Sequence, residues 1–205
     1  MDLLVGTTNL GKLAEVQAAL NHLPLRLLSL RDLDIRRQIV EDGTTYEENA
    51  LKKARTLADL SGYTTLADDS GLEVDALQRA PGVRSARYGG VEGDDARNNE
   101  KLLRELAVIP REERSARFIC VLALCRPTGS KKGGYLFRGE CEGWITFKPR
   151  GQGGFGYDPL FFYPPLGRTF AELDRETKCR VSHRGRALDK LKQAMPLILG
   201  LKTNP

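Results

Sequence analysis

The sequence predicts an α/β protein with a mixed β-sheet flanked by helices. Near the N-terminus, the apolar run Leu3–Val5 leads through a loop into a helical pattern and then into a second apolar run, Leu25–Leu30. Such a strand–helix–strand unit is typical of α/β proteins. Further along, Phe118–Leu124 and Tyr135–Cys141 flank a glycine-containing turn, which is typical of a β-hairpin. Together the two patterns favour a mixed sheet over a purely parallel one.

The chain is large enough to form one hydrophobic core. It has 205 residues, of which 40% are hydrophobic, and a chain of this length buries roughly 70% of its unfolded surface. We therefore expect one domain spanning residues 1–205. No apolar run approaches the roughly 18–20 residues that cross a bilayer, and Met1-Asp2-Leu3 lacks the layout of a signal peptide. We therefore expect a cytoplasmic protein with no membrane partner.

Charge and cysteine content bear on the partners and metals that the chain can bind. The net charge of +5 and the pI of about 9.1 suit an anionic partner, but Lys and Arg are scattered rather than clustered. The four cysteines form no Cys-x-x-Cys pair and the two histidines lie far apart, which argues against a structural zinc site. Cys120 lies in an apolar run, as expected of a core residue.

Helix signals are clearest in the first third of the chain. After the loop at residues 6–12, Leu13, Val16 and Leu20 recur at helical spacing. Thr45-Tyr46-Glu47-Glu48 is a capping box, which predicts the start of a second helix. The apolar face of that helix and its C-terminal glycine comprise Ala50, Ala54, Leu57, Ala58 and Gly62.

The middle of the chain predicts two strands and one helix. Tyr63–Ala67 reads as a strand that ends at Asp68–Gly71, and Asp94–Leu106 reads as a helix. Phe118–Leu124 is apolar on both alternating faces, which predicts a buried central strand. We expect Lys132–Gly134 to turn the chain back into the next strand of the hairpin.

The last third begins with a glycine-dense loop at residues 150–156, followed by an aromatic-rich segment at 157–163. Thr169 through Glu172 forms another capping box. The final helix is expected to run from about Ser182 to about Met195 and to end before Pro196.

The first loop resembles a phosphate-binding loop. Gly6 through Lys12 matches the Walker A spacing, but Leu13 stands where that motif needs the Ser or Thr that binds magnesium. A loop that leads into a helix still presents free backbone N–H groups to phosphate. Lys12 adds a charge and Asn9 a neutral donor. The spacing alone fits a simple helix-capping turn equally well.

Two acidic segments could provide metal ligands and a base. Asp68 and Asp69 follow an apolar strand, where adjacent acids are costly unless they are solvated, paired or bound to a cation. Such a pair can hold magnesium and deprotonate water. Glu41 opens a second acidic loop just before Thr45. Each segment alone could be a solvated turn, but their occurrence beside a phosphate-type loop favours a functional role.

Cations and an aromatic residue complete the set. Lys53 follows one turn into the second helix, and Phe155 lies in the glycine loop, where it could stack on a base. Lys178 and the segment Ser182–Gly185 gather further donors. Taken alone, Lys53 could be an exposed lysine, Phe155 a packed aromatic residue and His183 a structural histidine. Together with the loop and the acids, these residues indicate hydrolysis of a nucleoside triphosphate. A nucleic-acid groove would need more aromatics and a denser basic stripe.

Six motifs in one order resemble those of the inosine triphosphate pyrophosphatase family. They are Thr7–Lys12, Glu48–Ala54, Ala67–Leu72, Pro81–Tyr88, Gly153–Pro159 and Ser182–Gly185. The resemblance covers about Leu3 to Leu191, and its specificity comes from the order of the six, because each motif alone is weak. It implies an elongated two-lobed α/β fold with the active site in a central cleft, and a homodimer.

The resemblance also implies a reaction and a role for each motif residue. The reaction is hydrolysis of ITP, dITP and XTP to the monophosphate and pyrophosphate, with Mg²⁺ as cofactor and a small nucleotide, not a nucleic acid, as partner. Asp69 would be the general base, and the metal ligands would be Glu41, Asp68 and Asp69. The substrate-binding residues would be Thr7, Thr8, Asn9, Lys12, Lys53, Ser70, Phe155, Gly156, Tyr157, Asp158, Lys178, His183 and Arg184.

Other functions remain open from the sequence. A P-loop-like NTPase or kinase would cut between the β- and γ-phosphates, although Leu13 argues against it. A nucleotide- or RNA-binding module without turnover would fit the basic pI. A relative that makes a similar cut but prefers pyrimidines is a closer alternative. The sequence does not identify what would exclude guanine, which shares the 6-oxo group of hypoxanthine.

Overall fold

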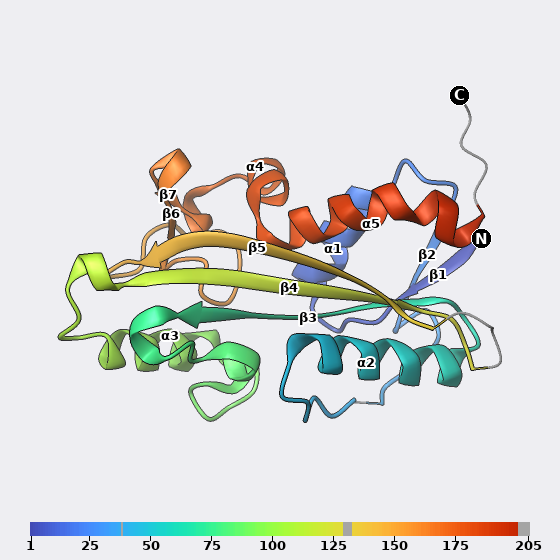
Figure 1. Ribbon diagram of the computed structural model, residues 1–205, viewed down its shortest axis with the longest axis horizontal. Coiled ribbons are helices and arrows are strands. Elements are labelled where there is room, and N and C mark those ends of the chain that lie inside the picture. The colour runs from blue at the N-terminus through green and yellow to red at the C-terminus, as the bar shows by residue number, and fades with distance from the viewer. Residues whose placement is uncertain (38, 129–132, 201–205) are drawn as a thin grey trace. The chain divides into compact units, whose positions relative to one another are not determined.

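The computed structural model describes residues 1–37, 39–128 and 133–200, and it contains a seven-stranded mixed sheet (Figure 1). The strand order is β2-β1-β3-β4-β5-β6-β7. Strand β1 (Asp2–Val5) pairs in parallel with β2 (Arg26–Ser29) and with β3 (Thr65–Val74). The last pairings of the sheet are antiparallel, which confirms the predicted mixed α/β fold.

Those antiparallel pairings join β5 (Tyr135–Ile145) to β6 (Phe161–Tyr163), and β6 to β7 (Arg168–Thr169). Strand β4 (Ser115–Cys125) is hydrogen-bonded to β3 and β5, so the strand predicted to be central is central. Neighbouring β4 and β5 fit the predicted hairpin, but residues 129–132, where part of its turn was placed, lie outside the described residues.

The chain divides into two compact units. Unit 1 is built from the described residues of Met1–Asp69, Cys120–Gly139 and Arg184–Pro205. Unit 2 is built from Ser70–Ile119 and Glu140–His183. Each unit has its own hydrophobic core, and each holds some of the residues that the sequence singled out.

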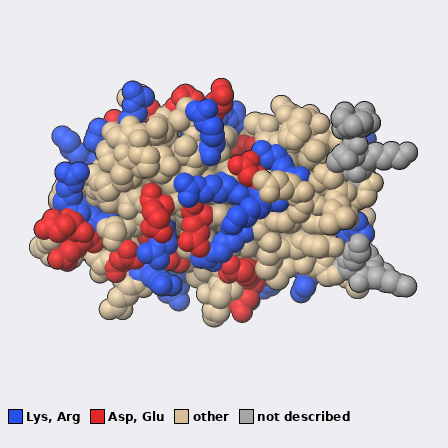
Figure 2. Space-filling view, turned by 45° about the horizontal axis from the view of Figure 1, so that its top comes forward, with Lys and Arg blue, Asp and Glu red and all other residues tan. Residues whose placement is uncertain are grey.

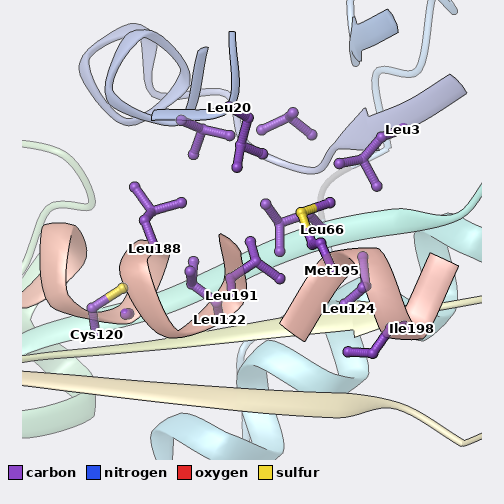
Figure 3. Close-up of a cluster of buried hydrophobic side chains, with 13 residues drawn as sticks. Leu3, Leu20, Leu66, Cys120, Leu122, Leu124, Leu188, Leu191, Met195 and Ile198 are labelled. Atoms are coloured by element: carbon purple, nitrogen blue, oxygen red, sulfur yellow. The ribbon is translucent and has the colours of Figure 1, made fainter. Parts of the chain in front are cut away.

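In unit 1, helices α1 (Leu10–Leu20) and α5 (His183–Leu199) pack on one face of the sheet. Figure 3 shows how their apolar side chains meet the strands around Leu66 and Leu122. The buried members of this cluster are Leu3, Val5, Val16, Leu20, Leu66, Cys120, Leu122, Leu124, Ala187, Leu188, Leu191, Met195 and Ile198. The helical spacing of the leucines and valine near the N-terminus therefore marks a true core face.

Helix α2 (Tyr46–Ser61) also belongs to unit 1, and it follows the acidic loop that contains Glu41. Thr45 caps it through the predicted capping box, and Gly62 ends it with a φ of 74°, a left-handed conformation that favours glycine. Its Leu57 packs against Leu4 and Leu28. The helix start is thus fixed at the point where it follows the acidic loop of Glu41.

In unit 2, helix α3 (Asp95–Glu105) and the strands surround an aromatic core. Asp94 caps α3 by accepting from the backbone N–H of Arg97. Phe118 of β4 packs against Phe161, with ring centroids 4.5 Å apart. The other buried members of the cluster are Leu72, Val74, Leu102, Leu106, Ala116, Cys141, Ile145, Tyr157, Leu160, Tyr163 and Phe170.

Two sequence expectations were wrong in detail, and one element was missed. Strand β3 does not end before Asp68–Gly71 but runs through these residues. Helix α5 does not end before Pro196, because Met195 and Ile198 are both buried in the core and hold the helix across the proline. A short helix, α4 (Arg175–Val181), was not expected; Asp174 caps it by accepting from Thr177 N.

In the part of the chain that the structure describes, five short 3₁₀ helices lie in the connections between the longer elements. The predicted capping box at Thr169 and Glu172 is present, but it opens a 3₁₀ turn rather than an α-helix. All four cysteines are free, and Cys120 is fully buried, which raises the pKa of its thiol to about 12. Within the described ranges, no helix is long and apolar enough to cross a membrane.

Candidate active site

Strand β3 directs Asp68 and Asp69 toward different helices. Side chains alternate between the two faces of a strand, so consecutive residues point in opposite directions. Asp68 meets Lys12 of α1 and Arg184 of α5, whereas Asp69 meets Asn49 of α2. Both carboxyl groups are buried. The strand extension that the sequence did not predict is therefore what gives the two acids separate surroundings.

Asp68 is held as a permanent anion by cations. Lys12 Nζ lies 2.9 Å and Arg184 NH2 3.4 Å from its Oδ2. Burial by itself would raise the pKa of Asp68, but Lys12, Arg184 and Lys53 outweigh it and hold the pKa far below its ordinary value. Asp68 is thus held in its ionised form at neutral pH.

Asp69 has the opposite electrostatics. Burial and the negative charge of Glu41 raise its pKa to about 6, against smaller lowering effects from Asn49, Lys53 and Lys12. Its Oδ2 accepts a 2.9 Å hydrogen bond from Asn49 Nδ2. A carboxylate with a pKa near 6 is far better suited to taking a proton from water than an ordinary aspartate.

Lys53 joins the acidic loop to the strand. Its Nζ forms an ion pair with Glu41 and donates to the backbone oxygen of Asp68 at 2.7 Å. Burial would lower the pKa of Lys53, but the surrounding acids Asp68, Glu41 and Asp69 raise it. The structure therefore brings Lys53, Glu41 and the two aspartates together, as the sequence predicted for a catalytic cluster.

Two residues of this cluster were missed by sequence reasoning. Asn49 is buried and bridges Asp69 to the acidic loop, because its Oδ1 accepts from Gly43 N at 2.8 Å. Glu15 of α1 is buried beside Arg184, whose NH1 donates to it at 2.6 Å. Asn49 lies within the Glu48–Ala54 motif, so that motif carried a signal. Glu15 lies outside the six motifs, and nothing in its sequence neighbourhood marked it.

The first loop has the features of an anion-binding helix start. Asn9 caps α1 by accepting from Lys12 N at 3.0 Å, and Asn9 N donates to Thr7 Oγ1 at 3.2 Å. Thr8 and Asn9 are exposed, so the loop is accessible. Lys12 lies behind it, paired with Asp68. Leu13 packs against the core of unit 1, which is consistent with its being no metal ligand.

Unit 2 holds the aromatic part of the predicted site. Lys178 is buried, forms an ion pair with Asp158, and places its Nζ 4.4 Å from the centroid of the Phe155 ring. Asp158 Oδ2 also accepts from Phe155 N at 2.8 Å. Gly154 has a φ of 76°, and a Cβ there would overlap with the Asp158 carboxylate. The glycine is therefore required for the loop to close over Asp158.

Four of the predicted residues have defined positions in their own units. Tyr157 is buried and its hydroxyl donates to Ser85 O at 2.9 Å. His183 is buried and stacks on Phe118, with ring centroids 4.6 Å apart and the planes 14° from parallel. Ser70 follows Asp69 on β3 and is partly buried. Arg184 is placed with Asp68 and Glu15 in unit 1, where it fixes the charge of Asp68.

The donor set fits magnesium only in the way in which magnesium binds a polyphosphate. Within the described ranges, no three His, Cys, Asp or Glu side chains gather in a cluster that could enclose a metal ion. Magnesium, however, is usually held by one or two carboxylates plus substrate phosphates and water. Burial and, after it, the negative charge of Glu41 raise the pKa of Asp69, and a cation between the two carboxylates would offset their repulsion. Asp68 already has two cationic partners, Lys12 and Arg184, whereas Glu41 has one, Lys53.

Comparison with known proteins identifies relatives over nearly the whole chain. A model of the Ham1 family matches residues 3–194. A dITP/XTP pyrophosphatase of Geobacter sulfurreducens is 56% identical over 190 residues, covering 93% of this chain and 94% of the relative. Another from Syntrophobacter fumaroxidans is 49% identical over 197 residues, covering 96% of this chain and 83% of the relative.

Solved structures give the same answer for the fold. A HAM1 protein from Coxiella burnetii superposes with a TM-score of 0.86 at 40% identity, covering 95% of this chain and 98% of that one. A nucleoside-triphosphatase described as a dITP/XTP pyrophosphatase, from Mycobacterium abscessus, superposes with a TM-score of 0.74 at 46% identity, covering 93% and 98%. The sequence matches and the shared architecture show that this chain belongs to the Ham1 family.

Proposed function

We propose that the protein hydrolyses nonstandard purine nucleoside triphosphates, namely ITP, dITP and XTP, to the nucleoside monophosphate and pyrophosphate. One observation carries the proposal: neighbouring Asp68 and Asp69 are both buried, but Asp68 is paired with Lys12 and Arg184, whereas Asp69 is hydrogen-bonded to the neutral Asn49. That arrangement separates a fixed anion from a proton acceptor. The names of the close relatives support the same reaction.

Asp69 is the general base in this proposal. Its carboxylate takes a proton from water as the water oxygen forms a bond to the α-phosphorus. The bond from the α-phosphorus to the bridging oxygen then breaks, and pyrophosphate leaves with that electron pair. Positioned general-base help is typically worth about 10²–10⁴ in rate. Asn49 orients the Asp69 carboxylate through the hydrogen bond described above.

Mg²⁺ is the proposed cofactor, with Glu41 and Asp69 as its protein ligands. We also include Asp68 in the acidic set that the resemblance implies, although its two cationic partners make it the weaker ligand. Bound with the triphosphate, the ion would neutralise charge that develops on the leaving pyrophosphate. Lys53, which is paired with Glu41, holds that carboxylate in place.

The phosphates are held by the first loop and the lysines. Thr7, Thr8 and Asn9 present donors at the start of α1, where the helix dipole favours an anion. Lys12 and Lys53 supply positive charge from behind the loop and from α2. The charge of Lys12 is partly compensated by Asp68, which keeps it ordered before substrate binds.

Base recognition is assigned to residues of the later motifs. Phe155 would stack on the purine, within the loop that continues through Gly156, Tyr157 and Asp158. Lys178, His183 and Arg184 are donors that match the 6-oxo group of hypoxanthine and xanthine, and Ser70 would contact the substrate. Adenine carries a 6-amino donor instead, and leaving such site donors unpaired can reject an analogue by roughly 10⁴–10⁵.

The surface charge favours a small nucleotide over a polynucleotide. Figure 2 shows Lys and Arg interspersed with Asp and Glu on the face in view, not a continuous basic surface. Binding of single-stranded nucleic acid uses a positively charged groove that follows the backbone.

This proposal also includes a single domain, a cytoplasmic location and the homodimer that the resemblance implies. Light scattering that gives twice the chain mass of 22.8 kDa would support the dimer.

One assay tests the reaction. The protein is incubated with ITP, XTP, GTP or ATP and Mg²⁺, and the products are separated. We expect monophosphate and pyrophosphate, formed from ITP and XTP far faster than from GTP or ATP. Diphosphate and phosphate would instead indicate a P-loop-like cut. Absence of turnover, or preference for a pyrimidine triphosphate, would contradict the proposal.

A further inference from the structure

The first turns of α3 hold Gly156 from both sides. Its backbone N–H donates to Asp95 Oδ2 at 2.7 Å, and its carbonyl oxygen accepts from Asn99 Nδ2 at 2.8 Å. Asp95 and Asn99 are four residues apart, so they lie on the same face of the helix. All three residues belong to unit 2. The two side chains therefore fix both peptide groups of the residue that directly follows Phe155.

The two side chains have opposite chemical requirements. Asn99 Nδ2 also donates to Asp95 O at 2.8 Å, so it faces two carbonyl oxygens. Only the NH₂ side of an amide can do this, which fixes its orientation. Asp95 faces an N–H group and must supply an acceptor. The two hydrogen bonds to Gly156 thus need an acceptor at position 95 and a donor at position 99.

The neighbouring residues of the loop are anchored in the same way. Phe155 N donates to Asp158 at 2.8 Å, and the Tyr157 hydroxyl donates to Ser85 O. Gly156 itself has a φ of 61°, and among the described residues, leaving out its two chain neighbours, no atom lies within 4 Å of the place where a Cβ would be. Its conformation is therefore set by its backbone partners rather than by packing. Asp95 and Asn99 supply these partners.

We propose that Asp95 and Asn99 are positioning residues for base recognition. By fixing the backbone of Gly156 they set the direction of the Phe155 ring, and with it the plane on which the purine stacks. Neither residue contacts substrate in this proposal, and both lie outside the six motifs of the sequence. The inference rests on the proposed function, in which the loop at Phe155 binds the base. It adds α3 to the elements that determine substrate preference.

Near-isosteric substitutions test the two requirements separately. Asn99→Asp places an acceptor against two carbonyl oxygens, whereas Asp95→Asn still offers an acceptor oxygen to the Gly156 N–H. Loss of one such hydrogen bond corresponds to a change of about tenfold. We therefore expect Asn99→Asp and Asp95→Ala to raise KM for ITP about tenfold with little change in kcat, and to reduce the preference for ITP over GTP. Asp95→Asn should stay close to wild type.

A readout that does not depend on turnover is amide hydrogen exchange in the ligand-free protein. We expect the peptide spanning residues 153–158 to exchange faster in Asn99→Asp and Asp95→Ala. Glu100→Ala is the matched control, because Glu100 is an exposed residue of the same helix turn. It should change neither exchange nor KM. Urea unfolding of each variant verifies that the fold persists.

The outcomes separate this inference from the proposed function. If the wild-type protein does not hydrolyse ITP, the proposed function fails, and calorimetric binding of IMP to the same variants then decides the role of α3. Weaker IMP binding by Asn99→Asp but not by Asp95→Asn supports the inference. Unchanged exchange in Asn99→Asp overturns it. The inference is also overturned if Asn99→Asp exchanges faster but its KM, its IMP binding and its preference for ITP are unchanged. The two hydrogen bonds to Gly156 would then serve the fold alone.

Discussion

Asp68 and Asp69 differ in charge behaviour because of what each touches on its own side of β3. Asp68 faces Lys12 and Arg184, which hold it ionised. Asp69 faces Asn49, a neutral partner, and lies near the charge of Glu41. At the scale of single residues, a shift of one position along β3 thus decides whether an aspartate side chain meets two cations or a neutral amide.

The raised pKa of Asp69 predicts a gain in stability when its charge is removed. A carboxyl whose pKa is higher in the folded state binds its proton more tightly there, so the wild type loses stability as pH rises from about 4 to about 6. Above that range, Asp69→Asn should be more stable than wild type by about 3 kcal/mol at most, since one pKa unit is worth about 1.4 kcal/mol. Urea unfolding at pH 4 and pH 8, without divalent cations, measures this.

The same variant should lose activity by about 10²-fold or more while still binding nucleotide. Asp42→Asn is a suitable control, because Asp42 is exposed and its pKa is lowered, chiefly by its hydrogen bond to Lys52. The Asp42→Asn variant should not show the higher free energy of unfolding that is expected for Asp69→Asn at pH 8. An Asp69→Asn protein with near-wild-type turnover, or with the same stability difference at both pH values, would remove the assigned role from Asp69.

At the scale of elements, the start of α2 links the capping chemistry to the site. Thr45 Oγ1 accepts from Glu48 N at 3.1 Å, and Glu48 Oε2 accepts from Thr44 N at 2.7 Å. Asn49 and Lys53 follow within the next turns of the helix and reach the two aspartates. The position of the cap therefore sets the register in which these two side chains meet β3.

Removing the cap should destabilise the protein without altering the chemistry directly. We expect Thr45→Ala to lower the free energy of unfolding by about 1 kcal/mol, the usual cost of losing a side-chain N-cap. Thr45→Ser keeps the hydroxyl and should restore most of it. Urea unfolding at pH 7 provides the comparison. Equal stability of the Ala and Ser variants would show that the capping hydrogen bond contributes nothing measurable here.

Short sequence patterns predicted an element well where its bounds depend on residues that are near one another in the sequence. Capping residues and helical spacing located α1, α2 and α3 closely. The end of β3 was misplaced, because Asp-Asp-Ser-Gly has turn-like composition and its charges are compensated only by residues distant in sequence. The short α4 has a mostly polar sequence and depends on its Asp174 cap, so no apolar periodicity marked it.

The site shows the same limit. Its motif residues could be named from the sequence, since each motif is a short local pattern. Asn49 and Glu15 gained their roles only through partners 20 and 169 residues away. Arg184 was expected to serve the base, and the structure adds a structural role, because it compensates the buried charges of Glu15 and Asp68. Non-local pairing of this kind leaves no regular spacing in the sequence.

At the scale of the whole chain, the buried charges of unit 1 connect its distant segments. Arg184 lies in the first turn of α5, Glu15 lies on α1 near the N-terminus, and Asp68 lies on β3. Burial would lower the pKa of Arg184, but Asp68 and Glu15 outweigh it and raise the pKa above its ordinary value. The side chains of this network therefore depend on one another for charge compensation.

Breaking this network from one side should be costly. Arg184→Met leaves Glu15 and Asp68 buried with one cation fewer, and removal of one partner of a buried ion pair typically costs about 3–5 kcal/mol. We expect a loss of that size in urea unfolding. The double variant Glu15→Gln with Arg184→Met should recover part of it, because one of the orphaned charges is then gone. Failure of the second substitution to recover any stability would show that Glu15 and Arg184 are not coupled.

This dependence also decides how the role of Arg184 in base selection can be tested. A truncation such as Arg184→Ala would change the charge balance around Asp68, and a fall in activity would then reflect a damaged cluster as much as a lost contact with the base. Arg184→Lys retains the positive charge but loses the planar fork of donors. If Arg184 reads the 6-oxo group, this variant should keep most of its stability and lose preference for ITP over ATP. An unchanged ratio in a stable Arg184→Lys protein would confine Arg184 to its role beside Asp68.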